Sequence, residues 1–386
     1  TIAVARVIAE QGDLTPGVLE IDRGRIIRVR QGRPPRGVHV QAGVLAPGLI
    51  DLQINGCAGV DFATLGDPAD LDRVHRFLLG TGVTGYLPTL ISTPLPQLRA
   101  ALHRWQGEAR AAGASGAPRI LGVHVEGPYL NPAFAGAHPK QDLRSPDAAE
   151  FTGILDEVPG LVKLVTLAPE LPGAAPLIEA ARRRRIVVSA GHTDATFDQA
   201  VKAFRSGVRM VTHIFNAMRP LHHREPGIVG AALLDEQVTV GLIADLVHLH
   251  PAVVRMVIER KGWKRTALVT DAAAAAGQLR GPSSLAGQTL TISDAPRLPS
   301  GTLAGSLLTL DQAIRNLMAI GVPVREAVLM ASAAPAAVLR RPDLGRIAVG
   351  ARADLVLFDR SMRVRTVYAS GTPVFTRGGI LPPATE

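Results

Sequence analysis

The stretch from residue 186 to residue 217 reads IVVSAGHTDATFDQAVKAFRSGVRMVTHIFNA and contains one complete strand–helix–strand unit. It opens with a short apolar run that ends at His192, continues through an amphipathic segment, and closes with a second apolar run interrupted at His213. Runs that are apolar nearly throughout, rather than alternating, are typical of strands buried on both faces of a parallel sheet. The stretch therefore predicts two parallel strands joined by a helix.

The same unit recurs along the chain, and the number of repeats decides the fold. Amphipathic segments such as PADLDRVHRFLLG (68–80) separate the runs and predict helices. Eight strand–helix units are the count of a (β/α)8 barrel, so we predict an α/β fold built on a TIM-like barrel. The six further runs are LAPGLIDLQING (45–56), TGVTGYLPTL (81–90), RILGVHVEGP (119–128), LVKLVTLAPE (161–170), VTVGLIAD (238–245) and TALVTDA (266–272).

The two ends of the chain predict a second, smaller unit. Both ends contain short β-type segments separated by turns, and neither supplies enough strands to bury a core alone. We therefore expect them to meet in one small β-sandwich. The predicted domains are the N-terminal part of the sandwich at 1–46, the barrel at 47–339, and the C-terminal part of the sandwich at 340–386.

The composition is that of a folded globular protein, with 386 residues of which 47% are hydrophobic. No apolar run reaches the ~18 residues of a membrane-spanning helix, and the first residues do not resemble a signal peptide, so we expect no membrane partner. The single cysteine, Cys57, cannot form an internal disulfide and fits a reducing, cytoplasmic location.

The net charge of +9 raises the question of a polyanionic partner. We expect no nucleic-acid partner, because the arginines are dispersed and aromatic residues, which stack on bases, make up only 4% of the chain. The one dense run, Arg182 to Arg185, is expected at a helix C-terminus, where cations are favourable without any ligand. A small anionic substrate such as a phosphate ester would also suit a positive field.

Acidic and imidazole groups end several of the predicted strands, and three of them suit a metal ion. Glu126, His192 and His213 each follow an apolar run, and the two histidines are 21 residues apart, about one strand–helix unit. In a barrel, the carboxyl ends of the strands lie on one rim, which carries the chemistry. Two imidazoles and one carboxylate leave an open coordination position for water on a divalent transition metal, although a single such histidine is more often structural.

Asp271 ends the eighth run and suits a different role. Hydrolysis needs a base that takes a proton from water and an acid that protonates the leaving group, and one carboxylate can serve as both in turn. An alternative is that Asp271 caps a helix beginning in the following alanine run, since Asp is a favoured N-cap. The two interpretations are compatible, and we favour catalysis.

Further histidines and arginines suggest where an anion would bind. Arg224, in the segment after His213, and His248, after the seventh strand, could together hold a phosphate, although either could equally be a surface residue. His124 lies on the same strand as Glu126 and is interpreted as structural. His75 and His103 fall in helical segments and are expected to be exposed.

At these residues the chain resembles the N-acetylglucosamine-6-phosphate deacetylases of the amidohydrolase superfamily. The resemblance extends over nearly the whole chain, and the combination of HVEGP, THIFNAM and REPG is specific to this group. The matching segments are APGLIDLQINGCAGVDF (46–62), GVHVEGPYLNPAFAGAHP (122–139), SAGHTDAT (189–196), THIFNAMRPLHHREPGIVGAAL (212–233), LVTDAAAAAG (268–277), GTLAGSLLTLDQAIRNL (301–317) and GRIAVGARADLVLFD (345–359).

The resemblance implies the same barrel and terminal β-sandwich, with one divalent transition metal per subunit, zinc first and iron, manganese or cobalt as alternatives. It implies a homodimer, in which the neighbouring subunit can contribute an anion-binding residue. It also implies roles for individual residues: Glu126, His192 and His213 as metal ligands, Asp271 as general acid/base, and Ala137, His138, Asn216, Ala217, Arg224, Asp245, His248, Leu303, Ala304 and Gly305 as substrate contacts.

The chain departs from the superfamily pattern at the first strand. Amidohydrolases with two metals carry His-x-His there, whereas this chain has Gln53 and Asn55, and amides are poor ligands for transition metals. We therefore predict one metal. The alanine run after Asp271 also differs from the usual pattern but leaves Asp271 itself intact, so we interpret it as a change in the loop. The bulky Leu246 in ADLVH is a further difference, and it leaves the choice between glucosamine and galactosamine open.

The predicted reaction is hydrolysis of the acetamide of N-acetyl-D-glucosamine 6-phosphate to D-glucosamine 6-phosphate and acetate, in amino-sugar catabolism and cell-wall sugar recycling. A metal-activated water would attack, and Asp271 would act as general acid/base. Two other functions stay open. A cyclic amidase or nucleobase deaminase would use the same barrel without a phosphate contact, and a non-catalytic binding protein could retain the fold.

Overall fold

In a computed structural model of the protein, which describes residues 1–111, 116–278 and 283–378, the barrel occupies the centre of the chain. Each of the eight apolar runs forms a barrel strand, and a helix follows each strand. The strands are β6 (Leu49–Ile54), β9 (Val83–Leu90), β11 (Val123–Glu126), β12 (Val162–Leu167), β13 (Val187–Ala190), β14 (Val208–Val211), β15 (Thr239–Leu242) and β16 (Thr266–Leu268). The predicted eight-stranded barrel is confirmed.

The barrel strands are parallel and follow one another in chain order. The first strand, β6, pairs with β9, while a short strand, β10 (Arg119–Ile120), also pairs with β9. Beyond the last strand, Ile54 forms a parallel bridge with Ala272, and the Asp271 amide donates to the Gln53 carbonyl at 2.8 Å. These contacts join the two ends of the sheet and bring β6 beside the residues that follow β16.

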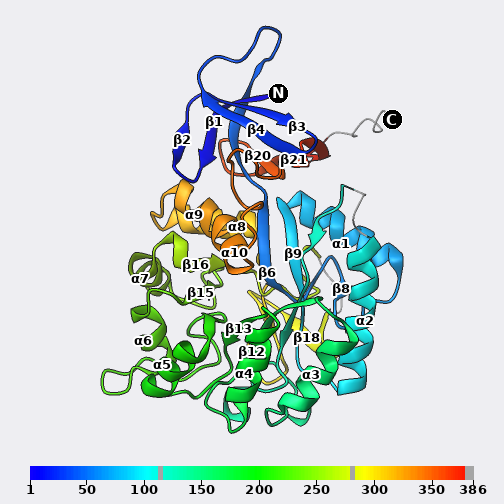
Figure 1. The fold of residues 1–386 in the computed structure, drawn as a ribbon, viewed down its shortest axis with the longest axis vertical. Coiled ribbons are helices and arrows are strands. Elements are labelled where there is room, and N and C mark those ends of the chain that lie inside the picture. Colours follow the sequence, from blue (N-terminus) through cyan, green and yellow to red (C-terminus); the bar gives the residue numbers. More distant parts are fainter. Residues whose placement is uncertain (112–115, 279–282, 379–386) are drawn as a thin grey trace.

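The helices surround the strands and bury apolar faces against them (Figure 1). In the 186–217 unit, Thr196 and Gln199 form a capping box at the start of the helix, and Gly207, at φ 125°, ends it. The eight helices that follow the strands are α1 (Pro68–Gly80), α2 (Leu95–Ala111), α3 (Ala148–Glu157), α4 (Ala174–Arg183), α5 (Phe197–Ser206), α6 (Gly227–Leu234), α7 (Pro251–Lys261) and α8 (Leu310–Ala319).

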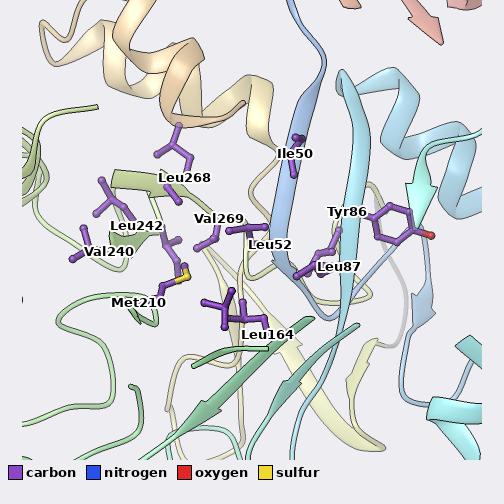
Figure 2. Close-up of a cluster of buried hydrophobic side chains, with 14 of the residues drawn as sticks. Ile50, Leu52, Tyr86, Leu87, Leu164, Met210, Val240, Leu242, Leu268 and Val269 are labelled. Carbon is purple, nitrogen blue, oxygen red and sulfur yellow. The ribbon is translucent and has the colours of Figure 1, made fainter. Parts of the chain in front are cut away.

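Side chains from strands on different sides of the barrel form a single apolar core. Figure 2 shows Leu52, Leu164, Met210 and Leu268 in one cluster, although they come from β6, β12, β14 and β16. All four are at most 1% exposed. Burying side chains of this size stabilises the fold by roughly 1.5–3 kcal/mol each. This packed interior fixes the strand ends on which the site is built.

The two termini form one mixed sheet with an apolar core of its own (Figure 1). Strand β5, from the N-terminal part, lies between β1 and β20, so the strands of the two chain ends join into one sheet at the β5–β20 pair. The predicted small β domain built from both termini is confirmed, while the exact domain boundaries stay a prediction, and residues 379–386 lie outside the described part. The strands are β1 (Ile2–Ala9), β2 (Gly12–Leu14), β3 (Gly17–Asp22), β4 (Arg25–Gln31), β5 (Val40–Pro47), β20 (Leu355–Phe358), β21 (Val364–Ala369) and β22 (Thr372–Thr376).

Some elements were not predicted from the sequence. After β16 the chain forms a three-stranded antiparallel sheet with a small apolar cluster around Ile91 and Leu285. The additional elements are β7 (Gly56–Cys57), β8 (Val60–Asp61), β17 (Ser283–Leu285), β18 (Gln288–Ile292), β19 (Pro296–Arg297), α9 (Val324–Met330), α10 (Ala333–Val338) and the 3₁₀ turns η2 (Pro132–Phe134), η3 (Lys140–Asp142) and η4 (Trp263–Arg265).

Two further observations concern the expectations above. His75 is 9% exposed and hydrogen-bonds the Tyr86 hydroxyl at 3.1 Å, so the expectation that it is exposed was wrong. Its position on α1 faces β9 rather than water.

In the parts of the chain that the structure describes, no helix combines the length and the apolar character needed to cross a bilayer.

Candidate active site

The carboxyl ends of β11, β13 and β14 bring Glu126, His192 and His213 together. Glu126 is the last residue of β11, and each histidine lies two residues beyond its strand. His192 and His213 both have positive φ values, 48° and 26°, and so does Asp271 after β16, at 50°. Such backbone conformations are unfavourable for residues other than glycine and persist where the surrounding structure imposes them, often at functional sites.

The three side chains present one atom each to a common point. The Nε2 atoms of His192 and His213 lie 3.2 and 3.1 Å from Oε1 of Glu126, and 3.2 Å from each other. Ligands about 2.1 Å from a tetrahedral zinc ion are ~3.4 Å apart, so this triangle is close to the size that a metal requires. The residues present thus fit a divalent transition metal, and all three are buried.

A hydrogen bond behind one of the ligands fixes its orientation. His192 Nδ1 donates to the Phe134 carbonyl at 2.9 Å, which turns Nε2 toward the common point. Burial opposes ionisation of Glu126, but hydrogen bonds from His192 and His213 outweigh it and hold the pKa of the carboxyl well below its ordinary value. An ionised carboxylate beside two imidazole nitrogens is a set of ligand atoms that suits a cation.

Gln53 and Asn55 connect Asp271 to this group. Gln53 Nε2 lies 3.1 Å from Glu126 Oε2 and 3.1 Å from Asp271 Oδ1, while Asn55 Nδ2 donates to the same Asp271 oxygen at 2.7 Å. Each amide therefore turns its hydrogen-bond donors toward a carboxylate and cannot offer that nitrogen to a metal. In the described residues, Glu126, His192 and His213 form the one group able to hold a metal.

Asp271 lies in an environment that favours its neutral form. Burial and the nearby charge of Glu126 raise the pKa of the Asp271 carboxyl above its ordinary value. The two amides both engage Oδ1, which leaves Oδ2 without a hydrogen-bond partner among the described residues. An aspartate whose pKa is moved toward neutrality is suited to both accept and donate a proton.

A cavity of about 360 Å³ opens over these groups, which is within the usual range for a small-molecule site. Of the residues expected from the sequence, it is lined by Glu126, His192, His213, Asp271, Ala137, His138, Asn216, Ala217, His248, Leu303 and Gly305. Gly305 is required here because it has φ 71° and a Cβ would lie 2.7 Å from the Asp271 carbonyl oxygen.

Three expected residues do not line this cavity. Asp245 lies behind it and accepts a hydrogen bond from His248 Nδ1 at 2.7 Å, so it orients a residue that does line the cavity. Ala304 is fully buried between two lining residues. Arg224 is exposed and hydrogen-bonds His223 at 2.8 Å, so the single chain does not place it beside His248 in the cavity.

Several residues of the site were missed by sequence reasoning. His138 Nδ1 lies 2.8 Å from the Ser92 hydroxyl, and burial together with the neighbouring His192 holds the pKa of His138 well below its ordinary value. Ser92 follows β9, so its position just after a predicted strand could have identified it as a candidate site residue. Phe134, Leu285 and Thr302 line the cavity itself. Phe134 and Thr302 lie inside the matching segments 122–139 and 301–317, whereas Leu285 lies in none.

A barrel whose strand ends carry a buried Glu–His–His group and an adjacent aspartate defines a class of metal-dependent hydrolases. The amidohydrolase family matches residues 44–374, and the chain belongs to this family. Amidohydrolases depend on metals, which agrees with the buried group described above.

Within this family, the chain is similar to deacetylases of amino-sugar phosphates. It is 39% identical to the N-acetylglucosamine-6-phosphate deacetylase of Bos taurus over 345 residues, which cover 86% of this chain and 83% of the relative. It is 35% identical to the N-acetylgalactosamine-6-phosphate deacetylase of Escherichia coli, with 95% and 97% of the two chains covered.

A solved structure shows the same overall architecture. The N-acetyl-D-glucosamine-6-phosphate deacetylase of Mycobacterium smegmatis, a mutant in complex with N-acetyl-D-glucosamine-6-phosphate, superposes with a TM-score of 0.92. It is 34% identical, and 97% of this chain and 99% of that chain are covered.

Proposed function

We propose that this protein hydrolyses the acetamide of N-acetyl-D-glucosamine 6-phosphate, releasing acetate and D-glucosamine 6-phosphate. The observation that carries the proposal is the buried Glu126–His192–His213 triangle with Asp271 linked to it through Gln53. Amide hydrolysis needs an activated water and a group that moves its proton, and this arrangement supplies a place for both.

Glu126, His192 and His213 would hold one divalent metal. When bound there, such an ion supplies Lewis-acid polarisation and lowers the pKa of water toward ~7. We favour zinc, with iron, manganese or cobalt as alternatives, since two imidazoles and one carboxylate accept each of them. The inward-facing donors of Gln53 and Asn55 support one metal rather than two.

In this mechanism Asp271 moves the proton. Its Oδ2 takes a proton from the attacking water and later delivers it to the nitrogen of the departing amine. Gln53 and Asn55 hold Oδ1 and so keep the carboxyl oriented through both steps. His138, which lines the cavity next to His192, is placed to donate to the acetyl oxygen as it becomes negative.

The 6-phosphate would bind at the His248 end of the cavity. Asp245 orients His248, and Asn216, Ala217, Leu303 and Gly305 would contact the sugar. In the described part of a single chain, the lining contains no Lys or Arg side chain. This supports the proposal that the active form is a homodimer, in which Arg224 or a residue of the neighbouring subunit supplies a positive charge for the phosphate.

The first experiment measures acetate release from N-acetyl-D-glucosamine with and without its 6-phosphate, on protein whose metal content has been counted. We expect about one metal per chain and a strong dependence on the phosphate. Equal activity on both sugars would contradict the phosphate site. If metal-loaded protein released acetate from neither sugar, the proposed hydrolytic site would still stand, but N-acetyl-D-glucosamine 6-phosphate would be excluded as its substrate.

A second arm addresses the sugar and the role of Arg224. N-acetyl-D-galactosamine 6-phosphate is included because one relative is named for it. Arg224→Ala should raise KM about tenfold for the phosphorylated sugar while leaving kcat nearly unchanged, because the residue would contribute binding rather than chemistry. Arg255→Ala, which removes an exposed arginine from α7, is the matched control and should change neither constant.

The single cysteine, Cys57, is buried, and burial raises the pKa of its thiol. A protonated, buried thiol is unreactive. We propose a cytoplasmic enzyme, and we propose the division of the chain at residues 46 and 339 as the boundary between the β domain and the barrel.

A further inference from the structure

A second cavity lies at the opposite end of the barrel from the candidate active site. It has a volume of about 430 Å³, and Val187, at the start of β13, and Thr239, at the start of β15, form part of its wall. The metal-binding triangle lies at the carboxyl ends of the same sheet, so the barrel strands separate the two cavities. In barrel enzymes this amino-terminal face usually contributes stability rather than chemistry.

Four arginines from four different elements line this cavity: Arg182, Arg209, Arg265 and Arg340. Arg182 lies in the last turn of α4, Arg209 lies in β14, Arg265 precedes β16, and Arg340 follows α10. Among the described residues, no Asp or Glu side chain lines the cavity. The one neighbouring carboxylate in an ion pair with this set is Glu179, 2.8 Å from Arg182.

Helix C-termini explain part of this arrangement but not all of it. Arg182 lies in the last turn of α4 and Arg340 follows α10, where cations are favourable. Arg209, however, lies within a strand, and Arg265 ends a 3₁₀ turn of only three residues. Helix dipoles also give no reason for four like charges, which repel one another, to line one hollow.

Two of the arginines are held in place by the local fold. Arg209 donates through one amino group to the carbonyls of Phe204 and Val208 at 2.6 and 2.9 Å, which leaves its other amino group free to bind. The stem of Arg182 passes over Gly207, where a Cβ would lie 3.0 Å from its Cδ. A guanidinium fixed in this way, such as that of Arg209, binds phosphate oxygens with little loss of entropy, whereas the guanidinium of Arg182 is already paired with Glu179.

We propose that this cavity binds a small molecule that carries two or more phosphate groups. The guanidinium of Arg182 is engaged by Glu179, which also pairs with Arg183, so three guanidinium groups of the cavity are left for a ligand. One phosphate monoester carries about −1.5 to −2 at pH 7 and would leave part of this charge unbalanced, whereas two phosphates match it. Among the described lining residues there is no aromatic ring, so the phosphates and not a base are the recognised part.

The test is isothermal titration of the metal-loaded full chain with inorganic diphosphate, and separately with ADP, at constant ionic strength. We expect one saturable site per chain for both ligands. Tighter binding of ADP would mean that its organic part also makes contacts, and equal binding would mean that the phosphates suffice. Both results support the site.

Variants of the exposed arginines locate the binding. Arg265→Ala and Arg340→Ala should each weaken diphosphate binding about tenfold, and the double variant about a hundredfold, with melting temperatures near that of the wild type. Arg205→Ala removes the same charge from the exposed face of α5 outside the cavity and should change the affinity less than twofold. His248→Ala, in the active-site cavity, should leave this binding intact.

Three results would overturn the proposal. The first is that neither diphosphate nor ADP binds saturably at millimolar concentration. If a single-stranded oligonucleotide binds while these two ligands do not, the cavity is not a site for a small phosphorylated molecule. The second is a loss of affinity in Arg205→Ala equal to that in Arg265→Ala, which would indicate diffuse attraction to the positive surface. The third is loss of binding in His248→Ala, which would place the ligand in the active site. Diphosphate can also bind the metal ion in the active site, but that heat signal would be the same in all arginine variants. A difference between the variants therefore reports binding at the arginines.

Discussion

Asp271 and Asp51 are both buried aspartates at the junction of the first and last barrel strands, but their partners give them different roles. Two side-chain amides hold one oxygen of Asp271. Asp51 instead accepts hydrogen bonds from the Thr270 hydroxyl at 2.6 Å and from the backbone N–H groups of Gln53 and Thr270 at 3.2 and 3.3 Å, so it fixes the backbone of the first strand and of the segment after the last strand. This difference in partners supports the proposed proton-transfer role of Asp271 and a supporting role for Asp51.

Asp271→Asn should lower kcat about a thousandfold while the protein folds and binds one metal. The amide oxygen can still accept from Gln53 and Asn55, so the local packing is preserved, but the side chain can no longer take up a proton. Steady-state acetate release and metal analysis of the same sample check this prediction. If kcat of the variant stayed within tenfold of the wild-type value, Asp271 would not be the residue that transfers the proton.

Asp51 predicts a pH dependence of stability. Burial raises the pKa of Asp51 from 3.8 to about 7, against the opposing hydrogen bonds of Thr270 and Gln53. The folded protein thus binds this proton more tightly than the unfolded chain. The stabilisation is complete below the unfolded pKa and is lost as the pH rises through about 7.

Asp51→Asn removes this titration, because an amide stays neutral. The free energy of unfolding of the wild type relative to the variant should therefore fall by about 2 kcal/mol between pH 5 and pH 8. Urea unfolding at the two pH values measures the difference. In Asp156→Asn, an exposed position, the same comparison should show no change, and a wild type that does not lose stability relative to Asp51→Asn would contradict the prediction.

At the scale of elements, the attachment of α2 depends on one side chain. Trp105 is fully buried, packs edge-on against Phe62 with ring centroids 5.2 Å apart, and donates from Nε1 to the Phe62 carbonyl at 3.0 Å. It thus joins the helix to the segment after β8 by both apolar contact and a hydrogen bond.

Trp105→Phe should lower the free energy of unfolding by about 2–4 kcal/mol, since it leaves a cavity and an unpaired buried carbonyl. Trp263→Phe, at a half-buried position in η4, is the matched control and should cost less than about 1 kcal/mol. Urea midpoints of both variants provide the measurement. Equal losses in the two variants would mean that the contact with Phe62 does not anchor α2.

The elements that could be predicted from sequence are those with a simple pattern. All eight barrel strands were found because strands buried on both faces are apolar nearly throughout, as in LVKLVTL at 161–167, where only Lys163 and Thr166 are polar. The β17–β18 hairpin was missed because its strands are short and mostly polar, although Ala286-Gly287 marks its turn. His75 was misplaced because a helical position alone does not say which face meets Tyr86.

At the scale of the whole molecule, the metal should stabilise the fold as well as the reaction. A ligand that binds only the folded state stabilises it by about 4 kcal/mol at a thousand times its dissociation constant. Removal of the metal by a chelator should therefore lower the melting temperature and abolish acetate release together, and added zinc should restore both.

Glu126→Gln should reproduce the chelated state, because it replaces the charged ligand with an amide. Metal content near zero is the expected result, while His103→Ala, at an exposed histidine on α2, should retain about one metal per chain. Metal content and calorimetric melting of the two variants decide the question. If Glu126→Gln retained its full metal content, the metal would be bound by other residues.

The candidate site was only partly visible in the sequence. Spacing placed Glu126, His192, His213 and Asp271 on one rim because the barrel geometry requires it. The hydrogen bonds of Gln53 and Asn55 depend on the contact between the first and last strands, which no local pattern encodes. Arg224 lies on the surface of the single chain, so its role depends on the assembly, and the sequence of one chain does not describe that.

Strand β5 lies between β1, made just before it, and β20, which is translated about 300 residues later. At ~5–20 residues per second, a ribosome takes roughly 15–60 s to make that interval. During this time one edge of β5 has no neighbour, and an unpaired edge readily joins other chains. The barrel segment is therefore synthesised while the N-terminal strands still lack β20 as a partner. The nascent chain is most prone to aggregate through the unpaired edge of β5 before Leu355 emerges.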